Sequence, residues 1–254
     1  MNTTAITGAG TGIGQAIALR LAKEGHQLAL FARNADRLAD VAEQAKTMGA
    51  TQVFIQSTDI RDRSSVDQAF KNASESLGNF TGLVANSGIG GPNSDGPSDR
   101  FDDLIQTNLM GTYYCLRAAQ RHLADGPSPR NLIAIASILG RFGVPGYTGY
   151  CASKTGIMGL VRALAHEVAQ DNIHVNAICP GWVETEMAWE GIDGMAAGMG
   201  ISRDEAHSIA MRQVPVGRMS QPEDVAGVVC WLMSPDARGV TGQGIDINGG
   251  AWMG

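Results

Sequence analysis

Short apolar runs alternate with longer amphipathic runs along almost the whole chain. The short runs have the length of β-strands, and the long runs repeat apolar residues at helical spacing, as at Leu38, Val41, Ala42 and Ala45. The pattern predicts strands over residues 3–7, 27–32, 52–57, 82–86, 131–136, 174–179 and 244–247. It predicts helices over residues 12–23, 35–48, 64–77, 101–123, 150–169 and 222–233.

The predicted strands are apolar along nearly their full length, which is typical of strands covered on both faces. Together with the strand-helix alternation, this predicts an α/β fold: a doubly wound, Rossmann-type parallel sheet of seven strands with helices on both faces. Such sheets bind ligands beyond the carboxyl ends of their strands. Five residues directly follow predicted strands and are expected at that edge, namely Gly8, Asp59, Asn86, Ser137 and Pro180.

The 254 residues show no linker or internal repeat, so residues 1–254 are expected to form a single domain. Residues 182–215 interrupt the alternation with a segment rich in Met and Trp. An insertion of this length is typical of a lid or binding loop, and its methionines would form an adaptable apolar wall. The alternative is a pair of helices that packs on the core or on a neighbouring subunit.

The composition excludes several classes of function. A formal net charge of -6 without a basic stretch argues against nucleic acid as a partner. The apolar runs are too short to span a bilayer, and the chain opens with a predicted strand rather than a leader, so we expect a cytoplasmic protein without membrane contact. Four widely spaced cysteines, without a CxxC pair or a histidine at ligand spacing, predict buried thiols and no metal site.

A glycine-rich turn separates the first predicted strand from the first predicted helix. Its sequence is Thr7-Gly8-Ala9-Gly10-Thr11-Gly12-Ile13-Gly14. Glycines in this context permit a tight turn and a close approach of a pyrophosphate, whose charge the free N–H groups of the helix N-terminus stabilise. The spacing departs from GxGxxG because Ile13 fills the third slot, and a merely flexible turn is the alternative. We expect dinucleotide binding here.

Tyr150 and Lys154 lie four residues apart at the start of a predicted helix, which places them one turn apart on the same face. A unit positive charge about 5 Å from the phenol, at an effective dielectric of roughly 20, would favour the phenolate by on the order of 3 kcal/mol, or about two pKa units. Lys154 is therefore expected to lower the pKa of Tyr150, which would make Tyr150 a general acid/base. Neither Tyr147 nor Tyr113 has a lysine at this spacing. Taken alone, the pair also fits an ordinary helix surface.

These motifs together resemble the short-chain dehydrogenase/reductase family, in its branch of roughly 250 residues. The resemblance extends from Thr7 to Gly250, and the order and spacing of the motifs make it specific. It rests on the TGxxxGxG turn, the YxxxK stretch, Ser137 thirteen residues before Tyr150, Asn108-Leu109-Met110-Gly111, Asp59-Ile60, Asn86-Ser87-Gly88, Pro180-Gly181 with Thr185, Gly217-Arg218, Pro222-Glu223-Asp224-Val225-Ala226, and Asn248-Gly249-Gly250.

The resemblance implies four catalytic residues. Tyr150 would donate a proton to a carbonyl oxygen as hydride arrives from a nicotinamide, and Ser137 would hydrogen-bond the same oxygen. Lys154 would tune Tyr150 and hold the nicotinamide ribose. Asn108 would anchor a water that relays protons to Lys154, or would only bond to neighbouring backbone.

The resemblance also implies the residues that bind the cofactor. Beside Tyr150 and Lys154 these are Gly8, Thr11, Gly12, Ile13, Gly14, Arg33, Asp59, Ile60, Asn86, Gly88, Pro180, Gly181, Val183 and Thr185. The chain departs from the family where Ala85-Asn86-Ser87-Gly88 replaces Asn-Asn-Ala-Gly and where Asn248 replaces a frequent Asp. The first departure weakens the expectation that Asn86 contacts the cofactor directly.

The choice between NADP(H) and NAD(H) depends on the end of the second strand, Phe31-Ala32-Arg33. A carboxylate at this point would bind the ribose 2′-hydroxyl of NAD, whereas an arginine accommodates the 2′-phosphate of NADP. Arg33 therefore predicts NADP(H), with NAD(H) as the alternative, although an Arg33 paired with Asp36 or Asp59 would be a plain surface residue. Thr11 offers no second basic contact.

The resulting hypothesis is an NADP-dependent carbonyl reductase that converts a ketone to a secondary alcohol, as the 3-oxoacyl and polyketide ketoreductases of the family do. The alternatives are an NAD-dependent secondary-alcohol dehydrogenase and a non-catalytic dinucleotide sensor. An apolar or cyclic small molecule is the expected partner, and the family implies a homotetramer built partly through helices 101–123 and 150–169. The residues expected to line the substrate site are Leu139, Phe142, Tyr147, Trp182, Met187 and Trp189, with Arg141 at its mouth.

Overall fold

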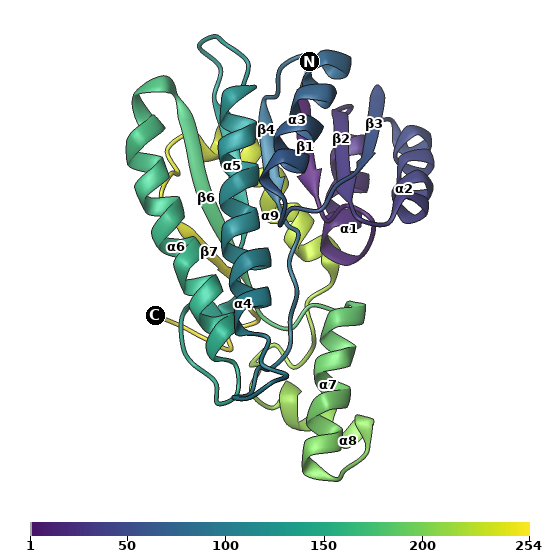
Figure 1. Ribbon diagram of the computed structural model, residues 1–254, viewed down its shortest axis with the longest axis vertical. Coiled ribbons are helices and arrows are strands. Elements are labelled where there is room, and N and C mark those ends of the chain that lie inside the picture. Colours follow the sequence, from purple (N-terminus) through teal and green to yellow (C-terminus); the bar gives the residue numbers. More distant parts are fainter. Residues whose placement is uncertain (1) are drawn as a thin grey trace.

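A single parallel sheet of seven strands forms the centre of the computed structural model, which describes residues 2–254 (Figure 1). The strand order is β3-β2-β1-β4-β5-β6-β7. The first three strands are added toward one edge of the sheet, and the last four are added from β1 toward the other edge. The predicted fold class is confirmed. The strands are β1 (Thr3–Thr7), β2 (Gln27–Ala32), β3 (Gln52–Ser57), β4 (Gly82–Ala85), β5 (Arg130–Ile135), β6 (Ile173–Pro180) and β7 (Gly244–Ile247).

Helices cover both faces of the sheet. One face carries α2, α1 and α9, with α1 in contact with both of the others, and the opposite face carries α3, α5 and α6 (Figure 1). These helices are α1 (Gly12–Lys23), α2 (Ala35–Met48), α3 (Arg63–Leu77), α5 (Thr112–Arg121), α6 (Thr148–Val168) and α9 (Pro222–Met233). Most predicted boundaries agree with these within two residues.

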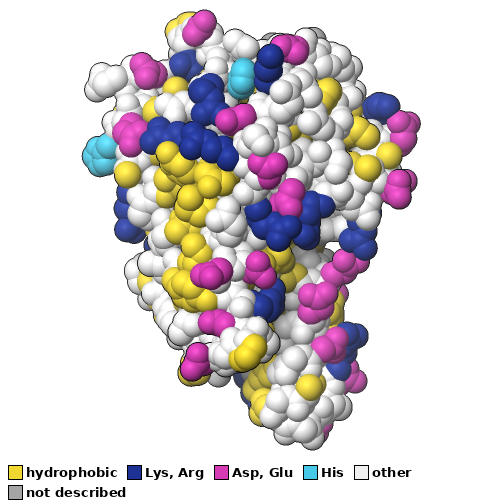
Figure 2. Space-filling view, viewed as in Figure 1, with side chains coloured by type: hydrophobic (Ala, Val, Ile, Leu, Met, Phe, Trp, Pro, Cys, Tyr) yellow, Lys and Arg dark blue, Asp and Glu magenta, His cyan; other side chains and the backbone are white. Residues whose placement is uncertain are grey.

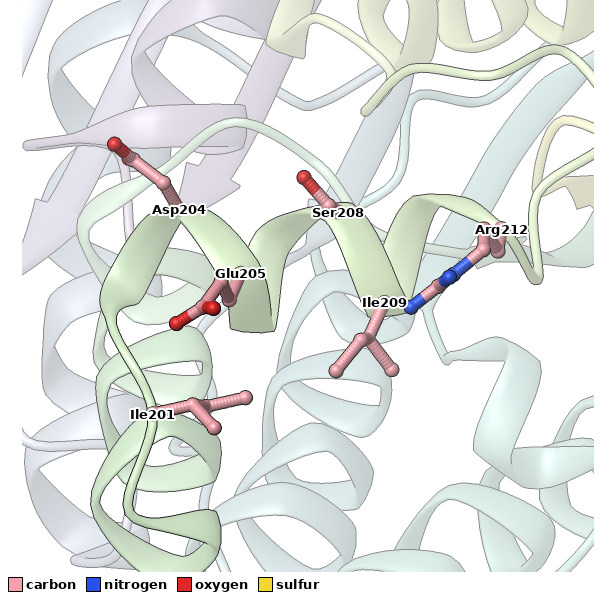
Figure 3. Close-up of a pocket in the computed structure, with 6 residues that line it drawn as sticks. All are labelled: Ile201, Asp204, Glu205, Ser208, Ile209 and Arg212. Atoms are coloured by element: carbon pink, nitrogen blue, oxygen red, sulfur yellow. The ribbon is translucent and has the colours of Figure 1, made fainter.

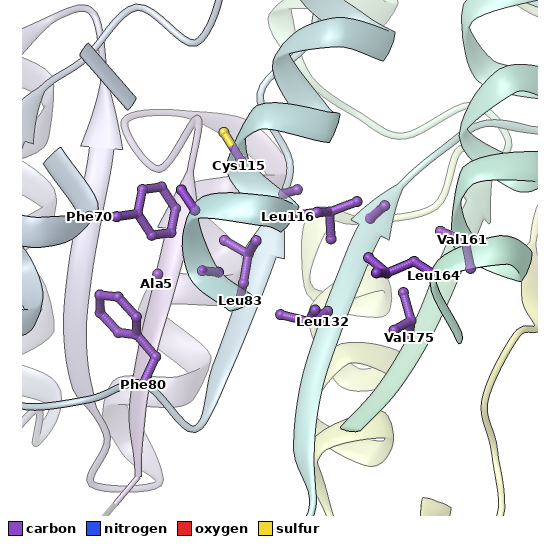
Figure 4. Packing of buried hydrophobic residues seen from close by; sticks show 14 of the residues in the cluster. Ala5, Phe70, Phe80, Leu83, Cys115, Leu116, Leu132, Val161, Leu164 and Val175 are labelled. Carbon is purple, nitrogen blue, oxygen red and sulfur yellow. The ribbon is translucent and has the colours of Figure 1, made fainter. Parts of the chain in front are cut away.

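Successive strand residues enter two separate hydrophobic cores, because side chains alternate across a strand. In β1, Ala5 joins the core under α3, α5 and α6, and its neighbour Ile6 joins the core under α1, α2 and α9. The first core contains a row of aromatic rings in which Phe70 stacks on Phe31 at 5.0 Å and meets Phe80 edge-on at 5.8 Å between centroids. Figure 4 shows this core reaching from Phe80 across Leu116 and Leu132 to Val161 of α6. The helix that carries Tyr150 is thereby held on the sheet.

Residues 182–215 form two helices, α7 (Glu186–Met199) and α8 (Arg203–Met211), which extend from one end of the body (Figure 1). They have a small core of their own around Ile192, Ala206 and Met211. Ser202 and Glu205 form a reciprocal capping box at the start of α8. The segment is therefore a pair of helices with a small core of its own, and its action as a lid stays a prediction.

The predicted helix over residues 101–123 is present as one unbroken helical run from Phe101 to Arg121, but its middle is a π-helix rather than an α-helix. The chain forms a short helix α4 (Phe101–Leu104), a π-helix (Ile105–Gly111) and then α5. A Cβ atom at Gly111 would lie 2.6 Å from Cδ1 of Ile60, so the glycine lets the π-helix pack directly on the turn after β3. The wider turn carries Asn108, whose side chain is fully buried.

Candidate active site

The glycine-rich turn lies at the carboxyl end of β1 and is shaped by contacts that only glycine permits. Gly8 and Gly12 have φ values of 65° and 53°, in the left-handed region. A Cβ atom at Gly14 would lie 2.1 Å from the carbonyl oxygen of Gly8. The first turn of α1 is therefore packed against the loop, and Thr11 at its N-cap position makes no side-chain cap. This leaves helix N–H groups for an anionic group, which fits a dinucleotide pyrophosphate.

Asn86, at the end of β4, supports this turn. Its Nδ2 donates to the carbonyl oxygens of Thr7 and Gly8 at 3.1 and 3.2 Å, and its backbone N–H donates to the Thr7 hydroxyl at 3.0 Å. The amide side chain thus joins β4 to the glycine turn. Asn86 therefore helps to fix the shape of the glycine turn.

Tyr150, Lys154 and Ser137 come together beyond the ends of β5 and β6. The Ser137 hydroxyl lies near enough to the Tyr150 phenol to lower its pKa, and Ser137 Oγ accepts from the Leu139 N–H at 3.1 Å. Lys154 lies one turn after Tyr150, with its Nζ 5.6 Å from the centroid of the tyrosine ring. The Lys154 Nζ donates to the carbonyl oxygen of Ile135 at 2.9 Å, so the ammonium group is held at the end of β5.

Burial dominates the electrostatics of the pair. Burial raises the pKa of Tyr150, and the hydrogen bond with Ser137 opposes that rise. The same burial lowers the pKa of Lys154 to about 8, because a low-dielectric surrounding disfavours the charged ammonium group. The sequence-based expectation that Lys154 lowers the pKa of Tyr150 is therefore wrong for this structure. The spacing along the helix is as predicted, but burial is the largest effect on the Tyr150 pKa, and Lys154 is not among the groups that shift it.

Both the oxygen and the nitrogen of the Asn108 side-chain amide are hydrogen-bonded to neighbouring residues. Its Oδ1 accepts from the Ile89 N–H at 2.9 Å, and its Nδ2 donates to the Ile89 carbonyl oxygen at 3.0 Å and to Ser153 Oγ at 3.2 Å. A Cβ atom at Gly88 would lie 3.1 Å from Asn108 Oδ1 and 3.5 Å from Lys154 Nζ. Asn108 thus lies close to Lys154, and its predicted role in holding a water stays a prediction.

Arg33 follows β2 with an exposed side chain and, within residues 2–254, makes no ion pair. Asp59 is paired instead with Arg61, at 2.6 Å between Nη2 and Oδ2. The hydrogen bonds from Arg61 lower the pKa of Asp59. The alternative of an Arg33–Asp59 pair is therefore wrong, and Arg33 is available to an anionic ligand. Ile60, in contrast, is buried, with only 6% of its surface exposed.

Arg37, in the first turn of α2, was not among the predicted site residues. A Cβ atom at Gly10 would lie 3.3 Å from Cβ of Arg37, so this side chain starts beside the glycine turn. Its guanidinium group pairs with Glu186 of α7 at 3.2 Å. The only sequence signal is its position in the first turn of the helix that follows Arg33.

The segment after β6 closes the site from the other side. Gly181 lies against Asn248, and Val183 is buried and bridged to Ser220. The methyl group of Thr185 would lie 3.1 Å from a Cβ atom at Gly12, which places the start of α7 beside the glycine turn. Thr185 also caps α7, because its Oγ1 accepts from the Ala188 N–H. The predicted residues Pro180 to Thr185 therefore reach the cofactor side of the sheet edge.

The predicted substrate residues fall into two groups. Leu139, Phe142 and Tyr147 lie on the segment between Ser137 and α6, and Met187 approaches Gly90 of the loop after β4. Trp182 and Trp189 pack within the α7–α8 pair instead, where Trp189 stacks on His207 at 5.3 Å. The guanidinium group of Arg141, which was expected at the mouth of the substrate site, is held by other residues. It pairs with Asp246, donates to the Gly244 carbonyl oxygen and stacks over Trp252.

A surface hollow on the α7–α8 pair is not lined by these predicted substrate residues. It has a volume of about 430 Å³ and is lined by Ile201, Asp204, Glu205, Ser208, Ile209 and Arg212 (Figure 3). All six residues belong to α8 or its two flanks, and neither Ser137 nor Tyr150 borders the hollow. The catalytic candidates are therefore identified by their chemistry and contacts rather than by the size of a cavity.

An α/β fold with a glycine turn at β1 and a Ser-Tyr-Lys cluster at the same sheet edge defines a dinucleotide-dependent oxidoreductase. A family model described as enoyl-(acyl carrier protein) reductase matches residues 8–251. The 3-oxoacyl-[acyl-carrier-protein] reductase FabG of Staphylococcus aureus is 34% identical over 251 residues, covering 98% of this chain and 97% of that protein. A ketoacyl reductase assigned to the monensin polyketide synthase of Streptomyces virginiae is 35% identical, covering 96% and 95%.

Solved structures agree with these relatives. The F189W form of actinorhodin polyketide ketoreductase with NADPH superposes with a TM-score of 0.91 at 31% identity, covering 98% of this chain and 97% of that one. Levodione reductase superposes with a TM-score of 0.88 at 27% identity, covering 98% and 96%. The chain belongs to the short-chain dehydrogenase/reductase family. It is an oxidoreductase of that family, as the motifs indicate.

Two kinds of structural feature are absent from residues 2–254. No helix in this range combines the length and the apolar character that crossing a membrane requires. Nor does the range contain three His, Cys, Asp or Glu side chains grouped to hold a metal ion. All four cysteines are free, and Cys151, next to Tyr150, is the only one that is not buried.

Proposed function

We propose that this protein reduces a ketone to a secondary alcohol with NADPH as the hydride donor. The observation that carries the proposal is the proximity of the Ser137 hydroxyl to Tyr150, together with the Lys154 Nζ at 5.6 Å from the centroid of the tyrosine ring. The three side chains lie at the edge of the sheet where the glycine turn can hold a dinucleotide. The names of the relatives support it, since two are ketoacyl or 3-oxoacyl reductases and one was solved with NADPH.

The protein residues would divide the work of carbonyl reduction. Bound NADPH supplies the hydride that reaches the carbonyl carbon. Tyr150 donates its phenolic proton to the carbonyl oxygen, and Ser137 donates a hydrogen bond to the same oxygen while negative charge develops on it. Because burial raises the pKa of Tyr150, the phenol stays protonated at neutral pH and is ready to act as the acid.

NADPH rather than NADH is supported by the charges after β2. Ala32 presents no carboxylate to repel a 2′-phosphate, and Arg33 carries an exposed guanidinium group without an ion pair in residues 2–254. Arginine recognises phosphate through paired N–H donors. An NAD-dependent alcohol dehydrogenase remains the second candidate, and a comparison of kcat/KM with NADPH and NADH decides between them.

The helical pair 182–215 would act as the substrate lid. Met187 is 44% exposed and Met199 is 53% exposed, so α7 presents flexible apolar side chains outside its own small core. Met187 also approaches Gly90 across the entrance. Such side chains adapt to apolar surfaces of varied shape. We therefore infer an apolar or cyclic carbonyl substrate, with 3-oxoacyl thioesters as the first compounds to test.

The outer surface of α5 and α6 would form a subunit interface in a cytoplasmic homotetramer. Figure 2 shows hydrophobic side chains gathered over these helices. Leu109, Tyr114 and Leu160 pack only partly on the core beneath them. Light scattering at several protein concentrations tests the assembly, and a monomer at all of them contradicts it.

Substitution of Tyr150 tests the reaction itself. Tyr150→Phe keeps the ring and removes the proton donor, so we expect unchanged NADPH binding and a loss of turnover of about 10²- to 10⁴-fold. Tyr113→Phe, a control on α5, removes a phenol whose ring contacts Tyr114 and Arg117 and should leave kcat within about twofold. Undiminished ketone reduction by Tyr150→Phe would exclude the proposed mechanism, and a wild-type protein that binds NADPH without reducing any ketone would favour the sensor alternative.

A further inference from the structure

Helix α6 begins without a cap from its own sequence. Tyr147 holds the N-cap position, and its side chain accepts no hydrogen bond from the first turn. The acceptor comes instead from Asn93, in the loop between β4 and α4. Asn93 Oδ1 accepts from the Gly149 N–H at 2.8 Å. Because the first N–H groups of a helix lack partners within it, Asn93 performs the function of an N-cap from a distant part of the chain.

Asn93 also fixes the residues on either side of this contact. Its amide exchanges hydrogen bonds with the Thr148 hydroxyl at 3.0 and 3.2 Å, and its backbone N–H donates to the Gly146 carbonyl oxygen at 2.8 Å. The half-buried side chain therefore spans the last residues of the loop and the first residues of α6. The several hydrogen bonds that Asn93 makes restrain this junction more strongly than a single hydrogen bond would.

The same side chain connects α6 to α4. Asn93 Nδ2 donates to Asp99 Oδ1 at 3.1 Å, and that oxygen accepts from the Phe101 N–H, the first residue of α4, at 3.0 Å. The two helices also touch at Gly149, where a Cβ atom would lie 3.0 Å from Leu104 Cδ1 and 3.2 Å from Phe101 Cα. One hydrogen-bonded path thus joins the start of α4 to the start of α6.

This junction lies directly beside the catalytic tyrosine. Tyr150 follows Gly149, and the Tyr150 carbonyl oxygen accepts from Ser153 Oγ, which in turn accepts from Asn108. Helix ends fray when their terminal N–H groups lose partners. A frayed first turn would move the Tyr150 hydroxyl relative to Ser137, and small displacements of reacting groups have large effects on rate.

We propose that Asn93 is a positioning residue for the reaction: it caps α6 from the β4–α4 loop and so holds Tyr150 toward Ser137. Asn93 touches neither of these two side chains and acts through Thr148 and Gly149. The inference rests on the proposed ketone reduction. It concerns the placement of the proton donor and not the cofactor or the substrate lid.

The test compares four variants at Asn93 or its partner with one matched control. Asn93→Ala removes the cap, and Asn93→Ser keeps the loop polar but cannot span the same set of partners. Asn93→Asp retains an acceptor for Gly149 but places a second carboxylate against Asp99. The double variant Asn93→Asp/Asp99→Asn restores one donor and one acceptor between these positions. Asp62→Ala is the control, because Asp62 caps α3, which carries none of the proposed catalytic residues.

We measure kcat and KM for NADPH and ketone, the thermal midpoint, and amide hydrogen exchange across residues 146–154. Asn93→Ala and Asn93→Ser should lower kcat by about tenfold to a hundredfold, with KM for NADPH within about twofold and faster exchange in this segment. The double variant should recover most of the kcat that Asn93→Asp loses. Asp62→Ala should lower the thermal midpoint without lowering kcat.

Two results would overturn the inference. One is wild-type kcat with unchanged exchange in both Asn93→Ala and Asn93→Ser. The other is an equal loss of kcat in Asp62→Ala, which would assign the effect to general stability. If the wild-type protein reduces no ketone, the proposed function fails, and the exchange measurement alone decides whether Asn93 holds the first turn of α6.

Discussion

Gly14 faces the carbonyl oxygen of Gly8 so closely that a Cβ atom at position 14 would lie 2.1 Å from it. The same atom would lie 2.6 Å from Nδ2 of Asn86. Backbone on one side and an anchored amide on the other leave no room for adjustment. The close packing of α1 on the loop therefore depends on the absence of one side-chain atom.

Gly14→Ala should abolish NADPH binding or prevent folding, because the loop must open to accept the methyl group. Fluorescence titration with NADPH and far-UV circular dichroism separate these outcomes. Gly227→Ala is the matched control: Gly227 also lies inside a helix, but nothing lies within 4 Å of its added Cβ. That variant should be unchanged or more stable by about 0.5–1 kcal/mol, because alanine favours helix over glycine. Normal binding by Gly14→Ala would contradict the role of this contact.

The pair of Arg141 and Asp246 should contribute more to stability than a chemically similar exposed pair. Both Arg141 and Arg203 pair with an aspartate and stack on a tryptophan, but their side chains are 14% and 54% exposed. Arg141→Met should lower the free energy of unfolding by about 1–3 kcal/mol, because it leaves Asp246 and the Gly244 carbonyl oxygen without a donor. Arg203→Met should change it by less than about 1 kcal/mol. Urea denaturation measures both, and equal effects would contradict the prediction.

The buried Lys154 should make stability depend on alkaline pH. Its pKa is lowered from 10.5 to about 8 on folding, so between these values the unfolded chain binds more protons than the folded one. Stability attributable to this group therefore rises with pH across that window. Relative to Lys154→Met, the wild-type protein should gain on the order of 2 kcal/mol between pH 7 and about 10. Urea unfolding of both proteins at each pH tests this, and parallel curves would contradict it.

Arg33 should select the phosphorylated cofactor. Arg33→Ala should raise KM for NADPH about tenfold or more while leaving KM for NADH little changed, because only NADPH carries the 2′-phosphate that the guanidinium group would bind. Arg20→Ala is a matched control, since Arg20 is exposed and pairs with Glu24 on the same helix. Steady-state kinetics with both cofactors give the answer. An equal change in both KM values would point to a structural role for Arg33.

The order of strands and helices and the candidate chemistry followed from local sequence features. Apolar runs of strand length alternate with helical stripes, so the parallel sheet and its two covered faces were predictable. Tyr150 and Lys154 were identified because a spacing of four residues places side chains on one helix face. The glycine turn was also predictable from local sequence, because a strand, a glycine-rich stretch and a helix follow one another along the chain.

Tertiary structure alone decided how these groups are held and how they titrate. The pKa of Tyr150 is raised because desolvation depends on what packs around the ring, which no helical spacing encodes. The π-helix around Asn108 and the cap that Asn93 provides to α6 arise from contacts between segments far apart in the chain. Periodicity reports neighbours along a helix or a strand, and it carries no signal for a side chain supplied by a distant loop. The sequence by itself therefore determined which residues could move the proton, while the folded packing decided their charge and their alignment.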